Sequence, residues 1–546
     1  MKRVTRHFEM RRILAWLLVI ASVGWMQIKT VAAAPSTTPG APDSAAAPAE
    51  QVFDIWEFQV EGNTVLPATA VERAVYGHLG EKKTINDVNA AQQELEVLYH
   101  SRGYGSVLVD IPEQDVENGI VRLKVTEGKV GRLSVTGSRY FSLGRIKSKV
   151  PSLATGRIPD LAKVQTELGA LGQLSRDRQI TPVLKPSRTP GKLDVELKVK
   201  DTLPLHGGVE LNDRFSADTS RLRLNTNLRY DNLWQREHSI GASYQIAPES
   251  PDEVEVFSVN YLWRFEDTDN LLALYVVRSN TNVATIGTLG VIGSGTIGGA
   301  RYIIPLKGSE SLYHTVNIGV DYKDFDEEIG FRDANAVVTP ISYLKFSVTY
   351  NVTFSGERGI GHLEATANLA PDGFGNTQKE FERKRFKGIP NFAYLHLAAD
   401  YQYNLWRGLS LFGKVQAQAA NSPLITNEQF AVGGVDDVRG YLEAEKLGDN
   451  GVGGTIELRS PDLAQLFALK LKSLELLAFT DSAALTTKNP LPGTRNGGLL
   501  WSAGVGLRLE PVAHIAAAMM WAYPINAGDR TPAGDDRFHF NIGYEF

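Results

Sequence analysis

The 546-residue sequence contains no cysteine. This absence excludes a disulfide scaffold, a thiolate metal site and a cysteine nucleophile, and it suits a chain that must cross an oxidising compartment. The net charge of -5 is too small to indicate a nucleic-acid partner, and none is expected. Because the length exceeds what a single hydrophobic core fills, two or more domains are predicted.

The sequence also lacks the short motifs of common active sites. It has no GxxxxGK[ST] phosphate loop, no HExxH zinc helix and no GxSxG nucleophile elbow. The GxGxxG string at residues 293–298 has no buried strand before it and no helix after it, so we interpret it as a Gly-rich turn. Four histidines in different strand-like segments are interpreted as lumen or interface residues rather than metal ligands: His206, His238, His514 and His539. No catalytic residue, cofactor-binding residue, cofactor or metal ligand is therefore predicted, and the chain is not expected to be an enzyme.

Beyond its first residues the chain has no apolar run long enough for a membrane helix. Residues 1–33 combine a basic start, an apolar run and small residues at the end, which is typical of a signal peptide. An N-terminal membrane anchor is the alternative, although the run is shorter than the ~20 residues that a spanning helix needs. Residues 34–52 are rich in Ala and Pro and predict an unfolded linker. If the protein lies in a membrane, it must cross as a barrel.

A repeated pattern occupies the first half of the chain. Residues 58–64 and 133–139 both alternate apolar positions and then reach a Gly followed by small polar residues. After each copy, two helix-like segments precede two strand-like ones. The expected helices lie at 67–78, 86–101, 143–150 and 160–174, and the strands at 106–111, 120–126, 180–184 and 192–199. Two β-α-α-β-β modules are predicted, at residues 53–128 and 129–201; open strand edges would let them bind another chain, and structural spacers are the alternative.

The second half of the chain has a different texture. From about residue 205 it consists of segments of roughly ten residues with period-two alternation, as a transmembrane β-barrel requires. At residues 221–230 the even positions are mostly apolar and the odd positions are all Arg or Asn. A soluble sandwich could alternate too, but it would not need so many aromatic residues on an outward face. We predict a barrel of sixteen antiparallel strands within residues 202–546.

Three pieces of the first module together resemble a known signature. They are LYHSRGY at residues 98–104, IPEQDVENG at 111–119 and VTEGKV at 125–130. They look like the POTRA-domain signature of the haemolysin secretion and activation family, the outer-membrane transporters of two-partner secretion. The resemblance implies two periplasmic α+β POTRA domains followed by a sixteen-strand β-barrel in the outer membrane of a Gram-negative bacterium.

The same resemblance implies a function. The POTRA domains would capture an unfolded partner exoprotein, and the barrel would form the porin-like channel through which it is secreted. Outer-membrane lipids and, during biogenesis, the barrel-assembly machinery are the other implied partners. A barrel-assembly (insertase) factor is the alternative, although such factors usually carry more POTRA modules. A passive porin would explain the barrel but not the modules.

The carboxyl terminus resembles an insertion signal. Phe538, Phe540, Ile542, Tyr544 and Phe546 share one face of the last predicted strand. A chain that ends on an aromatic residue of the lipid face is similar to the terminal signal of outer-membrane barrels. Tyr544 and Phe546 are therefore assigned to that signal.

A long connection at residues 420–450 joins the eleventh and twelfth predicted strands. It is too long for a hairpin and too apolar for a solvated loop, but the lumen of a sixteen-strand barrel is wide enough to hold it. Val438, Arg439, Gly440 and Tyr441 resemble the family's VRGY loop tip, which implies a tip inside the barrel near its periplasmic side, with the Arg paired to an Asp of the wall.

The wall partner is sought by strand parity. In residues 473–481 the even positions make the lipid face, so Phe479 and Asp481 point inward. Residues 479–483 resemble the family's FxDxG motif, with Ala483 where Gly is usual. Arg439 and Asp481 are thus the predicted pair. The alternative is that Arg439 is a solvated turn residue and Asp481 a turn cap.

Overall fold

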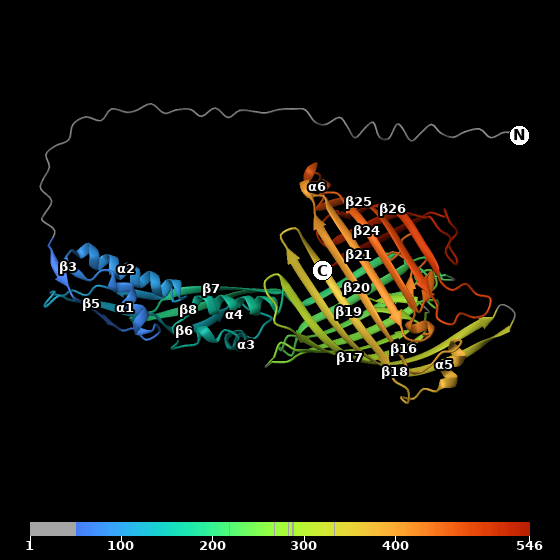
Figure 1. The fold of residues 1–546 in the computed structure, drawn as a ribbon, viewed down its shortest axis with the longest axis horizontal. Helices are drawn as coiled ribbons and strands as arrows, with labels where there is room; N and C mark the ends of the chain where they lie inside the picture. Colours follow the sequence, from blue (N-terminus) through green and yellow to red (C-terminus); the bar gives the residue numbers. More distant parts are fainter. Residues whose placement is uncertain (1–50, 218, 267, 282, 287–288, 332–333) are drawn as a thin grey trace, which may run out of the picture.

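The computed structural model describes residues 51–217, 219–266, 268–281, 283–286, 289–331 and 334–546. Two small modules follow one another and lead into one end of a much larger barrel (Figure 1). The predicted signal peptide and residues 34–50 of the predicted linker lie outside the described residues. Within the described ranges, no helix has both the length and the apolar character needed to cross a membrane.

The first module is a three-stranded sheet with two helices packed on it. β2 (Glu57–Glu61) pairs in parallel with β5 (Ile120–Glu127), and β5 pairs antiparallel with β4 (Val107–Asp110). α1 (Ala68–Tyr76) and α2 (Ile85–Ser101) connect β2 to β4. This is the element order that the sequence predicted.

The core of the first module lies between α2 and the sheet. Ala91, Leu95 and Tyr99 recur at helical spacing on α2 and are completely buried, as is Leu123 at the centre of β5. A small ribbon of β1 (Phe53–Ile55) and β3 (Gly80–Lys83) adds to the module. The sequence did not predict β3, because Gly-Glu-Lys-Lys shows no apolar alternation.

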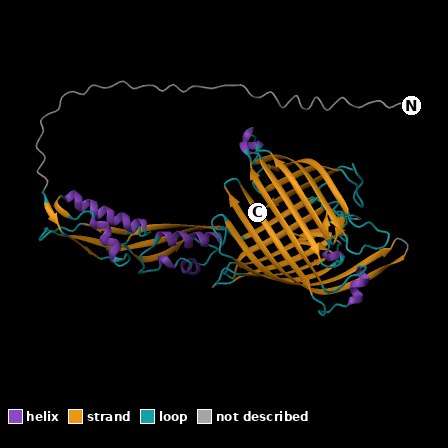
Figure 2. Cartoon of the chain, viewed as in Figure 1, coloured by secondary structure: helices purple, strands orange, loops and turns teal. Residues whose placement is uncertain are grey.

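The second module repeats the arrangement of the first. β6 (Lys129–Thr136) pairs in parallel with β8 (Lys192–Asp201), and β8 pairs antiparallel with β7 (Arg178–Pro186). α3 (Leu143–Ser148), a short 3₁₀ turn and α4 (Leu161–Gln173) lie between β6 and β7. The two sheets follow each other in line and carry their helices as separate layers (Figure 2).

The same steric constraint requires a glycine at the end of the first strand in both modules. Gly62 and Gly137 have φ values of +89° and +86°, a region that disfavours residues with a side chain. A Cβ at Gly62 would lie 2.3 Å from the carbonyl oxygen of Val125, and one at Gly137 would lie 2.4 Å from that of Val199. The repeat in the sequence therefore marks a close approach of the first strand to the central strand.

A carboxylate at the end of each central strand holds the turn after that glycine. Glu127 accepts hydrogen bonds from the backbone N–H groups of Thr64 and Val65, at 2.6 and 3.0 Å. In the second module, Asp201 accepts bonds of 2.8 Å from the N–H groups of Arg139 and Tyr140. These turns would otherwise leave backbone donors without partners beside the sheet.

The second half of the chain forms a closed barrel of sixteen strands, as predicted. Neighbours in sequence pair antiparallel, and β28 returns to β9 to close the ring. The second and third glycines of the GxGxxG string lie in a barrel strand, β16. The barrel strands are β9 (Leu205–Asn212), β10 (Arg223–Leu233), β11 (His238–Ile246), β12 (Glu255–Arg264), β13 (Leu271–Ser279), β16 (Gly295–Pro305), β17 (Leu312–Phe331), β18 (Ala334–Gly356), β19 (Gly359–Ala370), β20 (Phe392–Asn404), β21 (Ser410–Ala420), β24 (Asn450–Arg459), β25 (Ser473–Thr486), β26 (Gly498–Glu510), β27 (Ile515–Pro524) and β28 (Arg537–Glu545).

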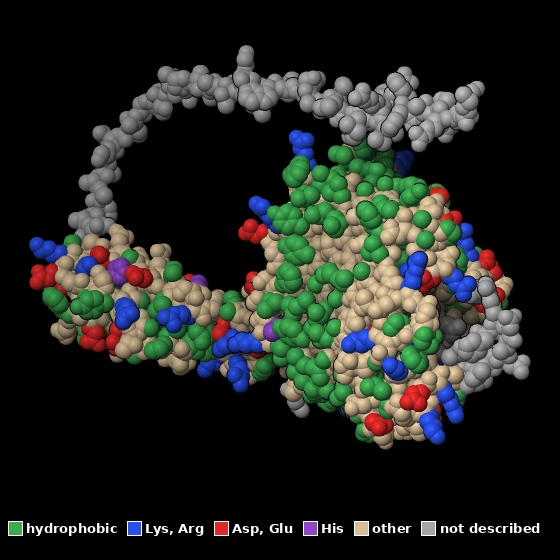
Figure 3. All heavy atoms as spheres, turned by 45° about the vertical axis from the view of Figure 1, so that its right-hand side comes forward, with side chains coloured by type: hydrophobic (Ala, Val, Ile, Leu, Met, Phe, Trp, Pro, Cys, Tyr) green, Lys and Arg blue, Asp and Glu red, His purple; other side chains and the backbone are tan. Residues whose placement is uncertain are grey.

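The barrel presents its apolar side chains outward. Along β25, Leu476, Ala478 and Thr480 are exposed, whereas Leu477, Phe479 and Asp481 are buried toward the interior. Hydrophobic side chains cover much of the barrel face in Figure 3, between rims that carry charged groups. β17 and β18 extend past their neighbours on the side away from the modules, where α5 (Gln378–Lys384) also lies (Figure 1). β14 (Val283–Ile286) and β15 (Leu289–Ile292) form a separate ribbon.

The carboxyl terminus contributes to the closure of the ring. β28 and β9 pair from Asn541 opposite Asn212 to Glu545 opposite Gly208. Beyond that register, Phe546 exchanges two backbone hydrogen bonds with Gly207, at 3.0 and 3.2 Å. Tyr544 and Phe546 are exposed on the outer face, which agrees with the parity predicted for this strand.

The Asp201 carboxylate makes the second module sensitive to acid. Burial acts to raise the pKa of Asp201, but hydrogen bonds from Tyr140, Ser138 and Arg139 outweigh it, so this pKa lies below its usual value. A lowered folded-state pKa contributes stability that is complete above the unfolded value of about 3.9 and is lost as the pH falls through the folded one.

We predict that Asp201→Asn loosens the turn at residues 138–141. At pH 7 the loss of about 1–3 kcal/mol of charge-assisted bonding should speed amide hydrogen exchange there by about ten- to hundredfold. Exchange corrected for intrinsic rates should accelerate below about pH 4 in the wild type but not in the variant. Asp110→Asn, on the exposed end of β4, is the control; unchanged exchange in Asp201→Asn would contradict the assignment.

Candidate functional site: the loop inside the barrel

The connection between β21 and β24 folds into the barrel instead of extending into solvent. It contains a 3₁₀ turn at Thr426–Glu428 and a two-stranded hairpin of β22 (Phe430–Val432) and β23 (Lys446–Gly448). Residues 433–445 connect the two strands of the hairpin and form the tip of the loop. The apolar residues of the whole loop are buried in the lumen, and these are Leu424, Ile425, Phe430, Val432, Val438, Tyr441 and Leu442.

Ionic contacts fix the base of the loop to the barrel wall. The carboxylate of Glu428 is fully buried and meets the ammonium groups of Lys323 on β17 and Lys345 on β18, at 2.5 and 3.2 Å. The hydroxyl groups of Tyr343 and Tyr394 donate to the same carboxylate, at 2.5 and 2.6 Å. A buried charge needs this many partners to offset its lost hydration.

Asp449 holds the other end of the loop. It exposes no surface, and it accepts hydrogen bonds from the N–H of Leu424 at 2.8 Å and of Lys488 at 2.6 Å. The side chain of Gln429 donates to it at 3.1 Å, and the guanidinium of Arg385 lies 3.4 Å away. The two ends of the loop are therefore joined to each other as well as to the wall.

At the tip of the loop, Arg439 meets Asp481 on β25. Its Nε and Nη2 donate to the two carboxylate oxygens at 2.7 and 2.8 Å, and its backbone N–H donates at 3.1 Å. The Arg439 side chain is 6% exposed and that of Asp481 is 0% exposed. This is the bidentate geometry that a guanidinium offers a carboxylate.

Two further wall residues complete the contacts of the guanidinium. Its carbon lies 3.4 Å from the centre of the Phe479 ring, which is a cation–π contact. Its Nη1 donates to Glu457 on β24 at 2.8 Å. Glu457 in turn meets Arg459 at 2.7 Å and Arg508 at 2.9 Å, so Arg439 belongs to a network that extends along the wall.

The rest of the VRGY tip packs and hydrogen-bonds around this pair. Gly440 has a φ of +92° and comes close to Ala522 on β27, and its N–H donates to His539 on β28 at 3.1 Å. The hydroxyl of Tyr441 donates to the carbonyl oxygens of Trp501 and Asn526, at 2.9 and 2.7 Å. The tip is thus bonded to four consecutive strands or their ends, from β25 to β28.

Val438 and Tyr441 join an apolar cluster against the wall. The cluster also includes Leu485 on β25 and Leu500 on β26. Ala483, at the position where the related motif has Gly, is 2% exposed and belongs to the same cluster. The departure from the motif therefore places a methyl group in the contact between loop and wall.

The residues that flank the tip bind the start of the barrel. The guanidinium of Arg214, just beyond β9, makes a bidentate contact with the carboxylate of Asp436, at 2.5 and 3.0 Å. Lys414 on β21 lies 3.4 Å from Asp437. The loop tip and its flanks consequently contact a continuous arc of the barrel wall, from β21 through β28 to the end of β9.

A cavity of about 700 Å³ lies beside the tip, toward the end of the barrel that carries the modules. Its lining includes Arg439 and Glu457 at one end and Glu475, Arg508 and Glu510 near the module-side ends of β25 and β26. The lumen is therefore open and charged below the tip.

The structure brings together the partners that the sequence suggested and adds further residues around them. The structure places Arg439 against Asp481, with Phe479 beside them, and the role of this pair stays a prediction. The contact falls near the middle of β25, whereas the resemblance implied a tip near the periplasmic side. Glu457 was missed, although the exposed Val452, Ile456 and Leu458 on β24 give the parity that points it inward.

Two family matches cover different parts of the chain. Residues 53–128 match the family described as POTRA domain, ShlB-type. Residues 331–509, which contain Arg439, Glu457 and Asp481, match the family described as haemolysin secretion/activation protein ShlB/FhaC/HecB. This chain is an outer-membrane transporter of the haemolysin secretion/activation type. The transporter belongs to two-partner secretion, and its POTRA domains lie on the periplasmic side of the outer membrane.

Curated relatives and solved structures agree with this placement. The chain is 23% identical over 433 residues to the outer membrane transporter CdiB of Dickeya dadantii, an alignment that covers 73% of this chain and 71% of that one. The structure of CdiB from Escherichia coli superposes with a TM-score of 0.61 at 19% identity, over 93% of both chains. BamA from Haemophilus ducreyi, solved without POTRA domains 1–3, gives a TM-score of 0.56 at 14% identity over 90% of this chain and 100% of that one. At these identities the structural likeness establishes the fold.

We predict that Asp481→Asn frees the tip of the loop. Breaking a buried ion pair costs about 3–5 kcal/mol when the other charge is left without a partner, and the cost is lower here because Glu457 stays 2.8 Å from Arg439 and lumen water adjoins the site. In planar bilayers the channel of the purified Asp481→Asn variant should therefore open more often than that of the wild type at the same voltage.

The matched control is Asp321→Asn. Asp321 on β17 is buried and pairs with Arg301 on β16 at 2.7 Å, so both partners belong to the wall and neither to the loop. Its replacement should leave the open fraction near that of the wild type. Equal opening of the wild type and Asp481→Asn would show that the pair does not hold the loop.

Proposed function

We propose that the transporter moves an unfolded partner exoprotein from the periplasm to the cell surface. The POTRA domains would bind the exoprotein in extended form, and the barrel would form the pore. The three-stranded sheets support the first step, because each has an edge strand to which an extended chain could add, β2 in the first module and β7 in the second.

The position of the loop is the observation that carries this proposal. An in-folded loop occupies a lumen that would otherwise be a channel, so passage of a chain requires the loop to move. Ionic contacts help to hold it, and those of Arg439 and Glu457 at the tip line a cavity of about 700 Å³. In such a site a released guanidinium or carboxylate can be hydrated, which makes withdrawal of the loop less costly than from a dry apolar core.

We extend the proposal to two partners of the barrel itself. Outer-membrane lipids would cover the exposed apolar face that Figure 3 displays. The barrel-assembly machinery would recognise the terminal aromatic residues during biogenesis. The exposure of Tyr544 and Phe546 on the outer face of β28 supports this assignment.

An insertase remains the second candidate function because the fold is shared with BamA. The family match at residues 331–509 favours secretion instead. Deletion of the transporter in its own host separates the two. Loss of one large secreted protein supports secretion, whereas loss of many outer-membrane barrels would support assembly.

We predict that Arg439→Ala abolishes export of the partner exoprotein while the barrel stays in the outer membrane. Removal of the guanidinium leaves Asp481 and Glu457 without their shared cation, so the loop loses the position on which controlled opening depends. Secreted and outer-membrane fractions are compared by immunoblotting.

Two variants frame this result. Arg301→Ala removes a guanidinium from the wall without touching the loop and should retain export. Arg439→Lys keeps the charge but cannot make the bidentate contact, so it should export poorly. Normal export by Arg439→Ala would refute the role of the tip.

A further inference from the structure

The second POTRA module and the barrel meet in a junction of specific polar contacts. Arg178 of the module donates to Glu237 of the barrel at 2.7 Å, and both side chains are nearly buried. Asn232, at the end of β10, donates to the carbonyl oxygen of Tyr140 at 2.9 Å. The junction therefore holds side chains from the two domains in fixed relative positions.

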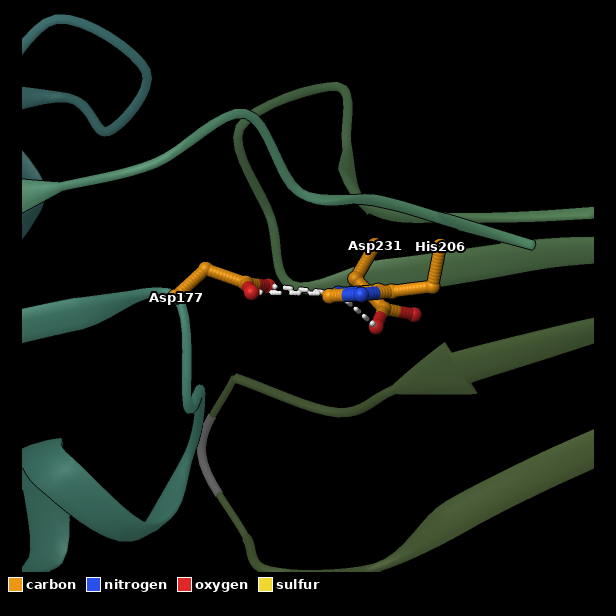
Figure 4. Close-up of side chains that lie close together, drawn as sticks. All are labelled: Asp177, His206 and Asp231. Carbon is orange, nitrogen blue, oxygen red and sulfur yellow. Dashed lines mark hydrogen bonds and ion pairs between the residues drawn. The ribbon is translucent and has the colours of Figure 1, made fainter. Parts of the chain in front are cut away.

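One group of metal-ligating side chains lies in this junction. Within the part of the chain that the structure describes, Asp177, His206 and Asp231 bring one ligand atom each to within 4.8 Å of one another. Asp177 precedes β7 in the module, whereas His206 lies on β9 and Asp231 on β10 of the barrel. Figure 4 shows the His206 ring directed at the Asp177 carboxylate, with the Asp231 carboxylate beside the same ring edge.

The distances in this group suit a small divalent cation. His206 Nε2 lies 3.1 Å from an oxygen of Asp177 and 3.7 Å from one of Asp231. Bonds of about 2.0–2.1 Å to a tetrahedral metal would separate its ligand atoms by about 3.3 Å. The two observed separations lie on either side of that value, and all three ligand atoms lie within 4.8 Å of one another, so an ion bound here would draw the side chains together.

The surroundings supply the remaining requirements of a metal site. A cavity of about 470 Å³ adjoins all three side chains and gives room for an entry path and for a water molecule as a fourth ligand. The guanidinium of Arg229 lies 3.1 Å from Asp231 and offsets part of the negative charge. Asp177 is 8% exposed, so its carboxylate gains more from a cation than an exposed one would.

We propose that Asp177, His206 and Asp231 form a Zn²⁺ site that joins the second POTRA module to the barrel. One imidazole nitrogen and two carboxylate oxygens make a donor set that Zn²⁺ accepts, with water completing the tetrahedron. Because one ligand comes from the module and two come from the barrel, the ion restricts the angle between them. This restriction bears on how a chain held by the modules is presented to the pore.

The sequence placed His206 among lumen or interface residues and predicted no metal ligand. Its partners are 29 and 25 positions away in the chain and belong to another domain and another strand. No spacing rule connects such residues. The site becomes visible only once the module is seated on the barrel.

The test uses the untagged full-length transporter in detergent, stripped with a chelator. Zn²⁺ is titrated against a chromophoric competitor, and Co²⁺ is titrated separately because its visible absorption reports tetrahedral nitrogen and oxygen ligands. We expect one Zn²⁺ per chain in the wild type. His206→Gln and Asp231→Asn should each weaken binding at least about tenfold, as the loss of even an outer partner of a metal site can do.

His78→Gln is the matched control. His78 pairs with Glu94 on the first module at 2.9 Å, a His–carboxylate pair outside the junction. It should bind Zn²⁺ as the wild type does. The heat-dependent gel mobility of the folded barrel shows that each variant is intact.

Three results would overturn the site. They are absence of stoichiometric Zn²⁺ binding in the wild type, binding unaffected by both His206→Gln and Asp231→Asn, and binding lost in His78→Gln. Limited proteolysis gives a second measure. Zn²⁺ should slow cleavage at the junction in the wild type and in His78→Gln, but not in His206→Gln or Asp231→Asn.

Discussion

The structure depends on a charged side chain held inside a membrane barrel. Arg439 reaches the lumen on a loop that begins and ends at one rim, and Asp481 with Glu457 receives it at mid-wall. Neither charge could remain there alone, since an isolated ion loses its hydration without replacement. The sixteen-strand ring provides both the space for the loop and the inward carboxylates that hold it.

Ionic contacts give the loop a position that is defined but reversible. Glu428 and Asp449 fix the base through buried partners, while the tip contacts a charged cavity on the module side. The guanidinium geometry selects one carboxylate, and the surrounding strands restrict its approach. A purely apolar plug would not fix the loop in a single position. It would also carry no charged groups that water could hydrate as the loop leaves the lumen.

Some parts of the molecule could be predicted from the sequence and others could not. Period-two alternation is set by the strand itself, so the barrel, its sixteen strands and the inward direction of Asp481 could be predicted. The twin β-α-α-β-β modules were predictable because the same strand-then-glycine pattern recurs in the sequence, and the structure shows that each of these glycines lies too close to a carbonyl oxygen for a side chain. β3 was not, since its four residues carry no apolar alternation.

Contacts between distant segments were beyond such reasoning. Arg439 and Asp481 were paired only because two motifs resembled those of a family, and not because any spacing joined them. Glu428 lies on a 3₁₀ turn, where no periodicity indicates a direction, and its lysines come from β17 and β18. The junction of the second module with the barrel depends on tertiary placement in the same way.

The central claim is that the loop leaves the lumen when the exoprotein passes. The absence of cysteine allows a single reporter to be placed at a tip residue that is buried against the wall, as Val438→Cys. Cells are treated with a membrane-impermeant maleimide while the exoprotein is being exported and while its synthesis is shut off. The account predicts strong labelling only during export. A reporter that stays equally protected during normal export would contradict it.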